Sequence, residues 1–112
     1  MESKHPIRVL FICSMNQRRS LTAEHIFADT PELQVRSAGT ARRDERAVTA
    51  ELVAWADMIC VMDQRHADWI EERMPGALGD KTLHVLNVPD EFRYMDEDLV
   101  ALLKGRLTDV LS

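Results

Sequence analysis

The sequence predicts an α/β fold in three layers, in which helices flank a four-stranded parallel sheet with the strand order 2-1-3-4. Four short runs rich in Ile, Val and Leu alternate with segments of helical character, which is the pattern of βαβ units with right-handed crossovers. The runs are almost continuously apolar, as expected of strands that are buried on both faces of a parallel sheet. The length of 112 residues fits a single domain over residues 1–112.

The strands and the first two helices follow from this pattern. Strands are expected at the four apolar runs, which are Ile7–Cys13, Leu33–Ser37, Met58–Met62 and Leu83–Val88. Apolar residues at helical spacing predict helices over about 20–28 and 48–54. The first helix would place Ala23, Ile26 and Phe27 on one face, and around the second helix Val48, Leu52 and Trp55 occur at helical spacing.

Two further helices are predicted from their end signals. Asp63 is a suitable N-cap for a helix over about 63–73, which ends before a Pro-Gly pair. The last helix, over about 96–111, begins with acidic residues that favour the positive end of the helix dipole. Gly105 lies inside this helix and costs about 1 kcal/mol relative to alanine, so a break there is an open alternative.

The composition is that of a globular protein. Hydrophobic residues make up 46% and charged residues 29% of the chain, and the 14 basic and 19 acidic residues leave a formal charge of −5. This acidic balance argues against nucleic-acid binding, and no apolar stretch is long enough to span a membrane. Cys13 and Cys60 form no disulfide framework, and the histidines lack metal-ligand spacing. We therefore expect a reduced, cytoplasmic protein without a metal site.

The chemistry is expected between Cys13 and Ser20, where the first strand passes directly into a helix. A short loop that closes onto a helix N-terminus directs backbone N–H groups and the positive end of the dipole toward a bound anion. Arg19 enters the first helical turn, and its guanidinium fork matches two phosphoryl oxygens. The same positive field favours the thiolate of Cys13, to which Ser20 can donate a hydrogen bond. The alternative is that Cys13 is a small core residue at the end of an apolar strand.

The pattern Cys-x5-Arg-Ser between a strand and a helix resembles the low-molecular-weight protein tyrosine phosphatases, most closely a short bacterial branch of that family. The similarity continues through Leu21-Thr22-Ala23-Glu24, Ser37-Ala38-Gly39-Thr40, Ala56–Asp63 and Val88-Pro89-Asp90-Glu91-Phe92. The last of these segments is similar to the acid loop of the family. The resemblance covers most of the chain and implies a phosphotyrosine phosphatase I-like fold.

The resemblance implies hydrolysis of a phosphorylated substrate, phosphotyrosine above all, through a phosphocysteine intermediate and without a cofactor. It implies that Cys13 is the nucleophile, that Arg19 binds the phosphoryl oxygens, and that Asp90 is the general acid, which a phenolate leaving group needs at neutral pH. Asn16 would brace the loop and Ser20 would assist the thiolate. The phosphate-binding set is then Cys13, Ser14, Met15, Asn16, Gln17, Arg18, Arg19 and Ser20, while Phe92 and Tyr94 are candidates for an aromatic wall or for ordinary packing.

Departures from the family pattern leave the efficiency of turnover open. Met15 stands in place of a glycine, Glu91 in place of a proline, and residues 41–46 in place of a longer loop and helix after Thr40. Arg18 replaces the second cysteine of many members and excludes their protective disulfide. Two alternative functions remain: a thiol-dependent arsenate reductase on the same fold, and a catalytically weak, oxyanion-binding pseudophosphatase. No oligomeric state is predicted.

Overall fold

The structure is a computed structural model that describes residues 6–112, and its centre is a four-stranded parallel sheet in the order β2-β1-β3-β4. The strands are β1 (Ile7–Cys13), β2 (Leu33–Gly39), β3 (Met58–Val61) and β4 (Thr82–Val85). The predicted fold class and strand order are therefore confirmed. The first strand has the predicted bounds, and the second extends two residues further, because all of 33–39 pairs with β1.

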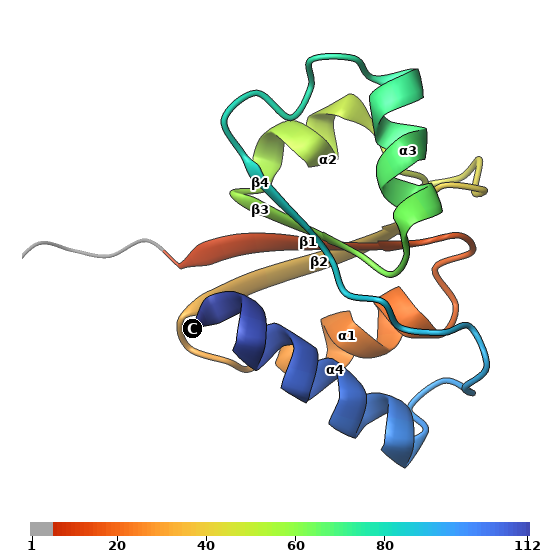
Figure 1. The fold of residues 1–112 in the computed structure, drawn as a ribbon, viewed down its shortest axis with the longest axis vertical. Helices are drawn as coiled ribbons and strands as arrows, with labels where there is room; N and C mark the ends of the chain where they lie inside the picture. The colour runs from red at the N-terminus through yellow and green to blue at the C-terminus, as the bar shows by residue number, and fades with distance from the viewer. Residues whose placement is uncertain (1–5) are drawn as a thin grey trace, which may run out of the picture.

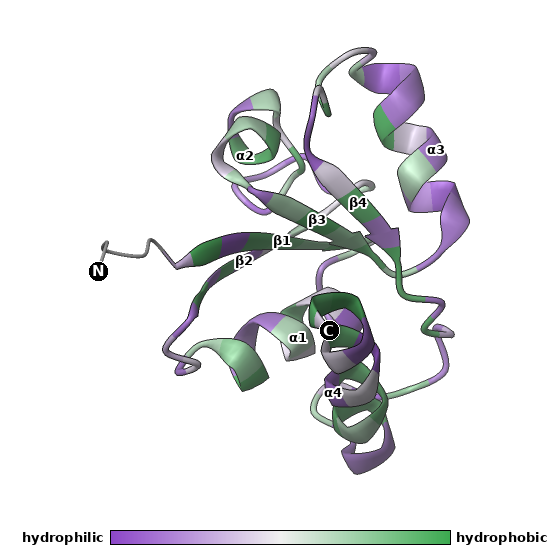
Figure 2. Cartoon of the chain, turned by 60° about the vertical axis from the view of Figure 1, so that its left-hand side comes forward, coloured by the Kyte–Doolittle hydropathy of each residue, from purple (hydrophilic) through white to green (hydrophobic). Residues whose placement is uncertain are grey.

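Four helices cover the two faces of the sheet (Figure 1). One face carries α1 (Arg19–Phe27) and α4 (Glu97–Leu111), and the other carries α2 (Ala50–Trp55) and α3 (Gln64–Arg73). Figure 2 shows hydrophobic residues concentrated in the strands and hydrophilic residues prevailing on α3. None of the helices within residues 6–112 combines the length and the apolar character that crossing a bilayer requires.

The central strand contributes to two apolar cores, because successive side chains of a strand point to opposite faces. Val9 and Phe11 belong to the core beneath α1 and α4, whereas Leu10 and Ile12 belong to the core beneath α2 and α3. All four are fully buried. This burial on both faces explains why the strand reads as a continuous apolar run in the sequence.

Other predicted boundaries are also wrong, such as the end of β3, which lies one residue earlier than predicted, at Val61. Helix α2 begins at Ala50 rather than at residue 48, because the Thr49 side chain caps it by accepting a hydrogen bond from Leu52 N at 3.1 Å. Strand β4 ends at Val85, three residues early, although the following segment stays beside β3 through a hydrogen bond from Leu86 N to Val61 O. The alternative of a break at Gly105 is excluded, since α4 is continuous through it.

The strand order determines where a ligand can bind. The chain continues from β1 to β2 on one side and reaches β3 on the other side of β1. The carboxyl ends of parallel strands share one edge, and a crevice opens at that edge where the order changes direction. The loop after β1 lies at this point, with the segments after β3 and β4 next to it (Figure 1).

Candidate active site

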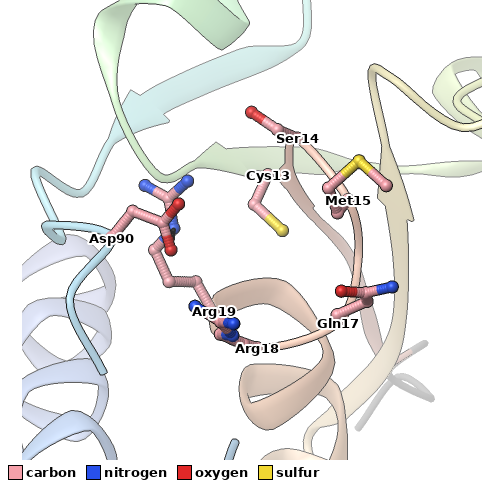
Figure 3. Close-up of a pocket in the computed structure, with 7 residues that line it drawn as sticks. All are labelled: Cys13, Ser14, Met15, Gln17, Arg18, Arg19 and Asp90. Atoms are coloured by element: carbon pink, nitrogen blue, oxygen red, sulfur yellow. Dashed lines mark ion pairs between the residues drawn. The ribbon is translucent and has the colours of Figure 1, made fainter. Parts of the chain in front are cut away.

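The loop after β1 curls around a small cavity at the carboxyl edge of the sheet (Figure 3). The cavity has a volume of about 160 Å³, well above the roughly 10–15 Å³ that one water molecule needs. Its lining consists of Cys13, Ser14, Met15, Gln17, Arg18, Arg19 and Asp90. The predicted nucleophile, arginine and general acid therefore surround one hollow, although Asp90 lies far from the loop in sequence.

The sulfur of Cys13 is surrounded by hydrogen-bond donors. The backbone N–H of Asn16 donates to Cys13 Sγ at 3.2 Å, and Ser20 Oγ lies 2.9 Å from the same sulfur. Asn16 Nδ2 donates to Ser20 Oγ at 2.8 Å, which leaves the Ser20 hydroxyl hydrogen free to point at the sulfur. Both predicted contacts, the brace from Asn16 and the hydroxyl at the sulfur, are present. Together they place two hydrogen-bond donors at the sulfur.

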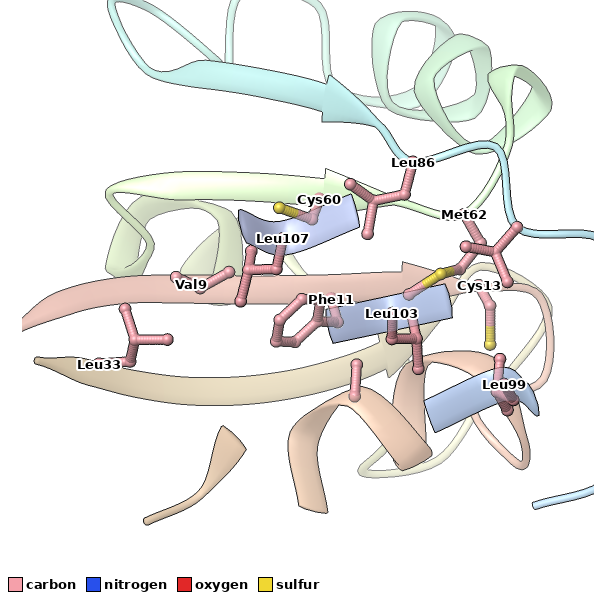
Figure 4. Close-up of a cluster of buried hydrophobic side chains, with 12 residues drawn as sticks. Val9, Phe11, Cys13, Leu33, Cys60, Met62, Leu86, Leu99, Leu103 and Leu107 are labelled. Carbon is pink, nitrogen blue, oxygen red and sulfur yellow. The ribbon is translucent and has the colours of Figure 1, made fainter. Parts of the chain in front are cut away.

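The sulfur is also sheltered by the protein interior. Cys13 is only 3% exposed and belongs to the same apolar cluster as Met62 of the segment after β3 and Leu99 and Leu103 of α4. Figure 4 shows Cys13 at the end of this cluster, close to Met62 and Leu99. The thiol is therefore both a core residue and a wall of the cavity, so the two interpretations of Cys13 are compatible.

The shape of the loop depends on two special backbone positions. Asn16 has φ of 55°, in the left-handed region that asparagine tolerates better than most residues. Gly39, at the end of β2, lies so close to the loop that a Cβ there would stand 2.5 Å from the carbonyl oxygen of Ser14. The following residues hold the loop by two hydrogen bonds, from Thr40 N to Cys13 O at 2.9 Å and from Ala41 N to Ser14 O at 2.8 Å.

Arg19 is a buried cation with specific partners. Only 2% of its side chain is exposed, and its Nη1 donates to Val88 O at 3.0 Å and to Asp63 Oδ2 at 3.3 Å. A buried charge needs such partners to offset the loss of water. Within residues 6–112 the Nε and Nη2 atoms donate no hydrogen bond, and this edge of the guanidinium is the one that can bind two oxygens of an oxyanion.

Asp90 forms an ion pair with this edge of Arg19. Its Oδ1 lies 3.7 Å from Arg19 Nε, and half of its side chain is exposed. The carboxylate therefore reaches the cavity from the segment after β4, as Figure 3 shows. An oxyanion bound by Arg19 would lie within reach of Asp90.

Two further residues contact the loop through the start of α3. Asp63 is the predicted N-cap and accepts a hydrogen bond from Arg65 N at 3.1 Å, while its other oxygen holds Arg19. His66 is 1% exposed, completes a capping box by accepting from Asp63 N at 3.2 Å, and lies 3.0 Å from Ser14 Oγ through Nε2. Burial lowers the pKa of His66 to about 4. The helical pattern of the sequence predicts only a cap and a plain helical position here.

Known proteins resemble this chain in structure, whereas the sequence comparisons find no match. No family model matches the chain, and no curated protein matches it. Among solved structures, the tyrosine phosphatase Wzb from Escherichia coli K30, in complex with phosphate, is 24% identical, with a TM-score of 0.73 and coverage of 92% of this chain and 94% of that chain. SP-PTP, a low molecular weight protein tyrosine phosphatase from Streptococcus pyogenes, is 19% identical, with a TM-score of 0.75 and coverage of 94% and 91%. The YwlE arginine phosphatase from Geobacillus stearothermophilus is 26% identical, with a TM-score of 0.73 and coverage of 95% and 93%.

The chain has the low-molecular-weight tyrosine phosphatase fold. The resemblance inferred from its motifs is thereby confirmed at the level of architecture. In this phosphatase fold the loop after β1, the cap of α3 and the segment after β4 meet at the cavity. The residues that the motifs assign to catalysis come from the first and the last of these three segments.

The predicted aromatic wall is not part of the cavity. Phe92 is half-buried and packs against the apolar core beneath α1 and α4. Tyr94 is exposed and turns toward His25 of α1, whose Nδ1 lies 2.5 Å from the tyrosine hydroxyl. Neither ring lines the cavity.

Asn16 and Ser20 of the predicted phosphate-binding set also lie outside the cavity lining, because they are buried behind the loop and support it from within.

The departures from the family pattern have local consequences. Met15 keeps a negative φ, so this position does not require glycine, and its side chain is 44% exposed at the rim instead of crowding the loop. Arg18 is exposed and lines the cavity, which adds positive charge to its entrance. Arg42, in the short segment after Thr40, forms a hydrogen-bonded ion pair with Asp44, and this hydrogen bond lowers the pKa of Asp44 to about 2.

Within residues 6–112 no three His, Cys, Asp or Glu side chains are grouped so that they could hold a metal ion.

Proposed function

We propose that this chain hydrolyses phosphomonoesters through a covalent phosphocysteine on Cys13, with phosphotyrosine as the favoured substrate. One observation carries the proposal: the Cys13 sulfur receives hydrogen bonds in a cavity that is also lined by Arg19 and by the carboxylate of Asp90, which forms an ion pair with Arg19 Nε. A core cysteine without a function needs neither a buried arginine nor a carboxylate in front of it. The architecture that this chain shares with solved phosphatases supports the same conclusion.

In the first step the thiolate of Cys13 attacks phosphorus from the side opposite the leaving oxygen. The new S–P bond forms as the P–O bond breaks, and the leaving oxygen takes the proton of Asp90. The loop amides and the Nε and Nη2 atoms of Arg19 bind the remaining phosphoryl oxygens. These donors are held in place before the substrate arrives, which is the condition for strong stabilisation of developing charge.

In the second step water attacks the phosphocysteine. Asp90, now a carboxylate, accepts a proton from the water, the S–P bond breaks, and inorganic phosphate leaves. The sulfur returns as a thiolate, to which the hydroxyl of Ser20 and the amide of Asn16 donate hydrogen bonds. The same donors that favour the nucleophile therefore also favour it as a leaving group.

The rim of the cavity supports an aromatic substrate. Met15 offers an exposed thioether beside the cavity, and such sulfur atoms make favourable contacts with aromatic rings. Arg18 adds a positive charge for the dianionic phosphate group. Methionine thus takes the place of the aromatic wall that Phe92 and Tyr94 do not form.

The decisive experiment compares wild type, Cys13→Ser and Asp90→Asn in the presence of EDTA. We expect Cys13→Ser to lose turnover of p-nitrophenyl phosphate but to retain phosphate binding. Asp90→Asn should lose about 10²–10³-fold on phenyl phosphate and less on p-nitrophenyl phosphate, whose leaving group needs less protonation. Wild-type turnover by Cys13→Ser would refute the nucleophile. Phosphotyrosine and phosphoarginine peptides should be compared, since solved structures of this fold include phosphatases described for each.

The alternative functions predict different results. An arsenate reductase that passes a disulfide along its own chain needs a second accessible thiol, but Cys60 is fully buried and its pKa is raised to about 12 by burial. Arsenate-dependent thiol oxidation would nevertheless support a reductase that uses an external thiol. Tight vanadate binding without turnover would support the pseudophosphatase.

A further inference from the structure

The capping box of α3 reaches back to the residue that follows the nucleophile. His66 uses one ring nitrogen inside the box, where Nδ1 accepts from the backbone N–H of Asp63 at 3.2 Å. Its other nitrogen, Nε2, lies 3.0 Å from Ser14 Oγ. The histidine is 1% exposed and thus links the start of α3 to the loop from inside the protein.

The first of these contacts determines the direction of the second. A neutral imidazole has one N–H and one acceptor nitrogen. Since Nδ1 accepts from Asp63, the ring hydrogen is on Nε2, and Nε2 therefore donates to Ser14 Oγ. The neutral form fits the low pKa that burial gives His66 among Asp63, Arg19, Arg65 and Asp90.

Ser14 is a position where such a hydrogen bond has consequences for the site. It lines the cavity directly after Cys13, and its carbonyl oxygen accepts from Ala41 N at 2.8 Å. The residue is thus held from two sides, through its backbone by the segment after β2 and through its side chain by α3. Releasing one of these two contacts would let the peptide after the nucleophile rotate, and with it the amides that face a bound oxyanion.

We propose that His66 is a positioning residue that acts through Ser14 and holds the loop after β1, the phosphate loop of the proposed function, in its oxyanion-binding shape. This inference rests on the proposed function of the same loop. It differs from a purely structural role, in which His66 would only cap α3 and the loop would be indifferent to it. The geometry distinguishes the two, because Nδ1 alone suffices for the cap.

Two substitutions separate the cap from the contact to Ser14. In His66→Asn the side-chain oxygen replaces Nδ1 as an acceptor, but no atom reaches the position of Nε2. In His66→Gln a side-chain N–H₂ group reaches close to the position of Nε2, and glutamine is also a usual partner in capping boxes. Ser14→Ala removes the contact from the other side and leaves the cap intact. Thr49→Ala is the matched control, because it removes the cap of α2 without touching the loop.

The measurement is the dissociation constant for inorganic phosphate by calorimetry, with thermal stability as the second readout. We expect Ser14→Ala and His66→Asn each to weaken phosphate binding about 3- to 10-fold, the double variant to be no weaker than either, and His66→Gln to recover most of the loss. Thr49→Ala should lower stability and leave phosphate binding unchanged.

Three outcomes would overturn the proposal. These are wild-type phosphate affinity in His66→Asn, effects of Ser14→Ala and His66→Asn that multiply in the double variant, or a wild type that binds no phosphate. Phosphate binding without turnover of any phosphomonoester would instead refute the proposed function, while the double-variant comparison would still decide the role of His66.

Discussion

A methyl group at Gly39 should damage the phosphate loop without touching the nucleophile. The Cβ of an alanine there would lie 2.5 Å from Ser14 O, 2.8 Å from Arg42 Cγ and 3.1 Å from Asn16 N, whereas ordinary contacts begin near 3.4 Å. The arginine side chain can move away, but the two backbone atoms belong to the loop itself. Relief of the clash therefore requires the loop to move away from β2 by most of an ångström.

The cost of Gly39→Ala can be bounded from this geometry. Overpacking of a tight site typically costs about 1–3 kcal/mol, and the hydrogen bonds from Thr40 to Cys13 and from Ala41 to Ser14 would be stretched as well. We expect the midpoint of urea unfolding to fall by about 1 M, and phosphate binding to weaken by at least tenfold because the loop amides are displaced.

Gly105→Ala is the matched control for this substitution. Nothing lies within 4 Å of a Cβ at Gly105, which is in the interior of α4. The same change from glycine to alanine should therefore raise the free energy of unfolding by about 0.5–1 kcal/mol and leave phosphate binding unchanged. Wild-type phosphate affinity and wild-type stability in Gly39→Ala would refute the reasoning about the close approach of β2.

Three further predictions test the charges and thiols. The pKa of His66 is lowered from 6.5 to about 4 in the folded state. His66 therefore binds a proton more readily in the unfolded chain than in the folded protein. The free energy of unfolding should fall by roughly 2 kcal/mol between pH 6.5 and pH 5. His66→Gln should remove this slope in urea titrations, and an equal slope in the variant would contradict the assignment. Asp63→Asn should lower kcat/KM about tenfold, because Arg19 loses its charged partner, while thermal stability changes little, since asparagine is as good an N-cap; an unchanged kcat/KM would count against the contact. Iodoacetate should modify Cys13 and leave Cys60 intact in the native protein, with phosphate protecting Cys13, as followed by mass spectrometry; early modification of Cys60 would contradict its burial.

The parts of the fold that the sequence predicts well are those determined by burial. The first strand has the predicted bounds because both of its faces pack into apolar cores, which leaves a continuous apolar run. The predicted start of α2 is two residues too early. Val48 is buried, but its N–H donates to Gly39 O, and the residue lies outside the helix. Apolar spacing alone does not distinguish these two situations.

The site is predictable where one segment carries the chemistry. Cys13, Arg19 and Ser20 lie on a single strand–loop–helix segment, so their spacing already determines their neighbours. His66 could not be assigned in this way, because its contact with Ser14 joins residues 52 positions apart. Asp63 could have been found from the sequence, because it directly follows the apolar run 58–62 that predicts the third strand and so lies at the carboxyl edge of the sheet. The directions of Phe92 and Tyr94 depend on the core and on His25, which no local pattern encodes.

The shared packing of Cys13 and α4 has a consequence during synthesis. Leu99 and Leu103 complete the apolar cluster around the sulfur, yet they follow every strand in the chain. At about 5–20 residues per second, a ribosome needs roughly one to three seconds to add this helix. During that interval the nascent chain already contains Cys13 but lacks the helix that helps to bury its sulfur. Oxidants therefore reach the thiol more easily in the nascent chain than in the folded protein.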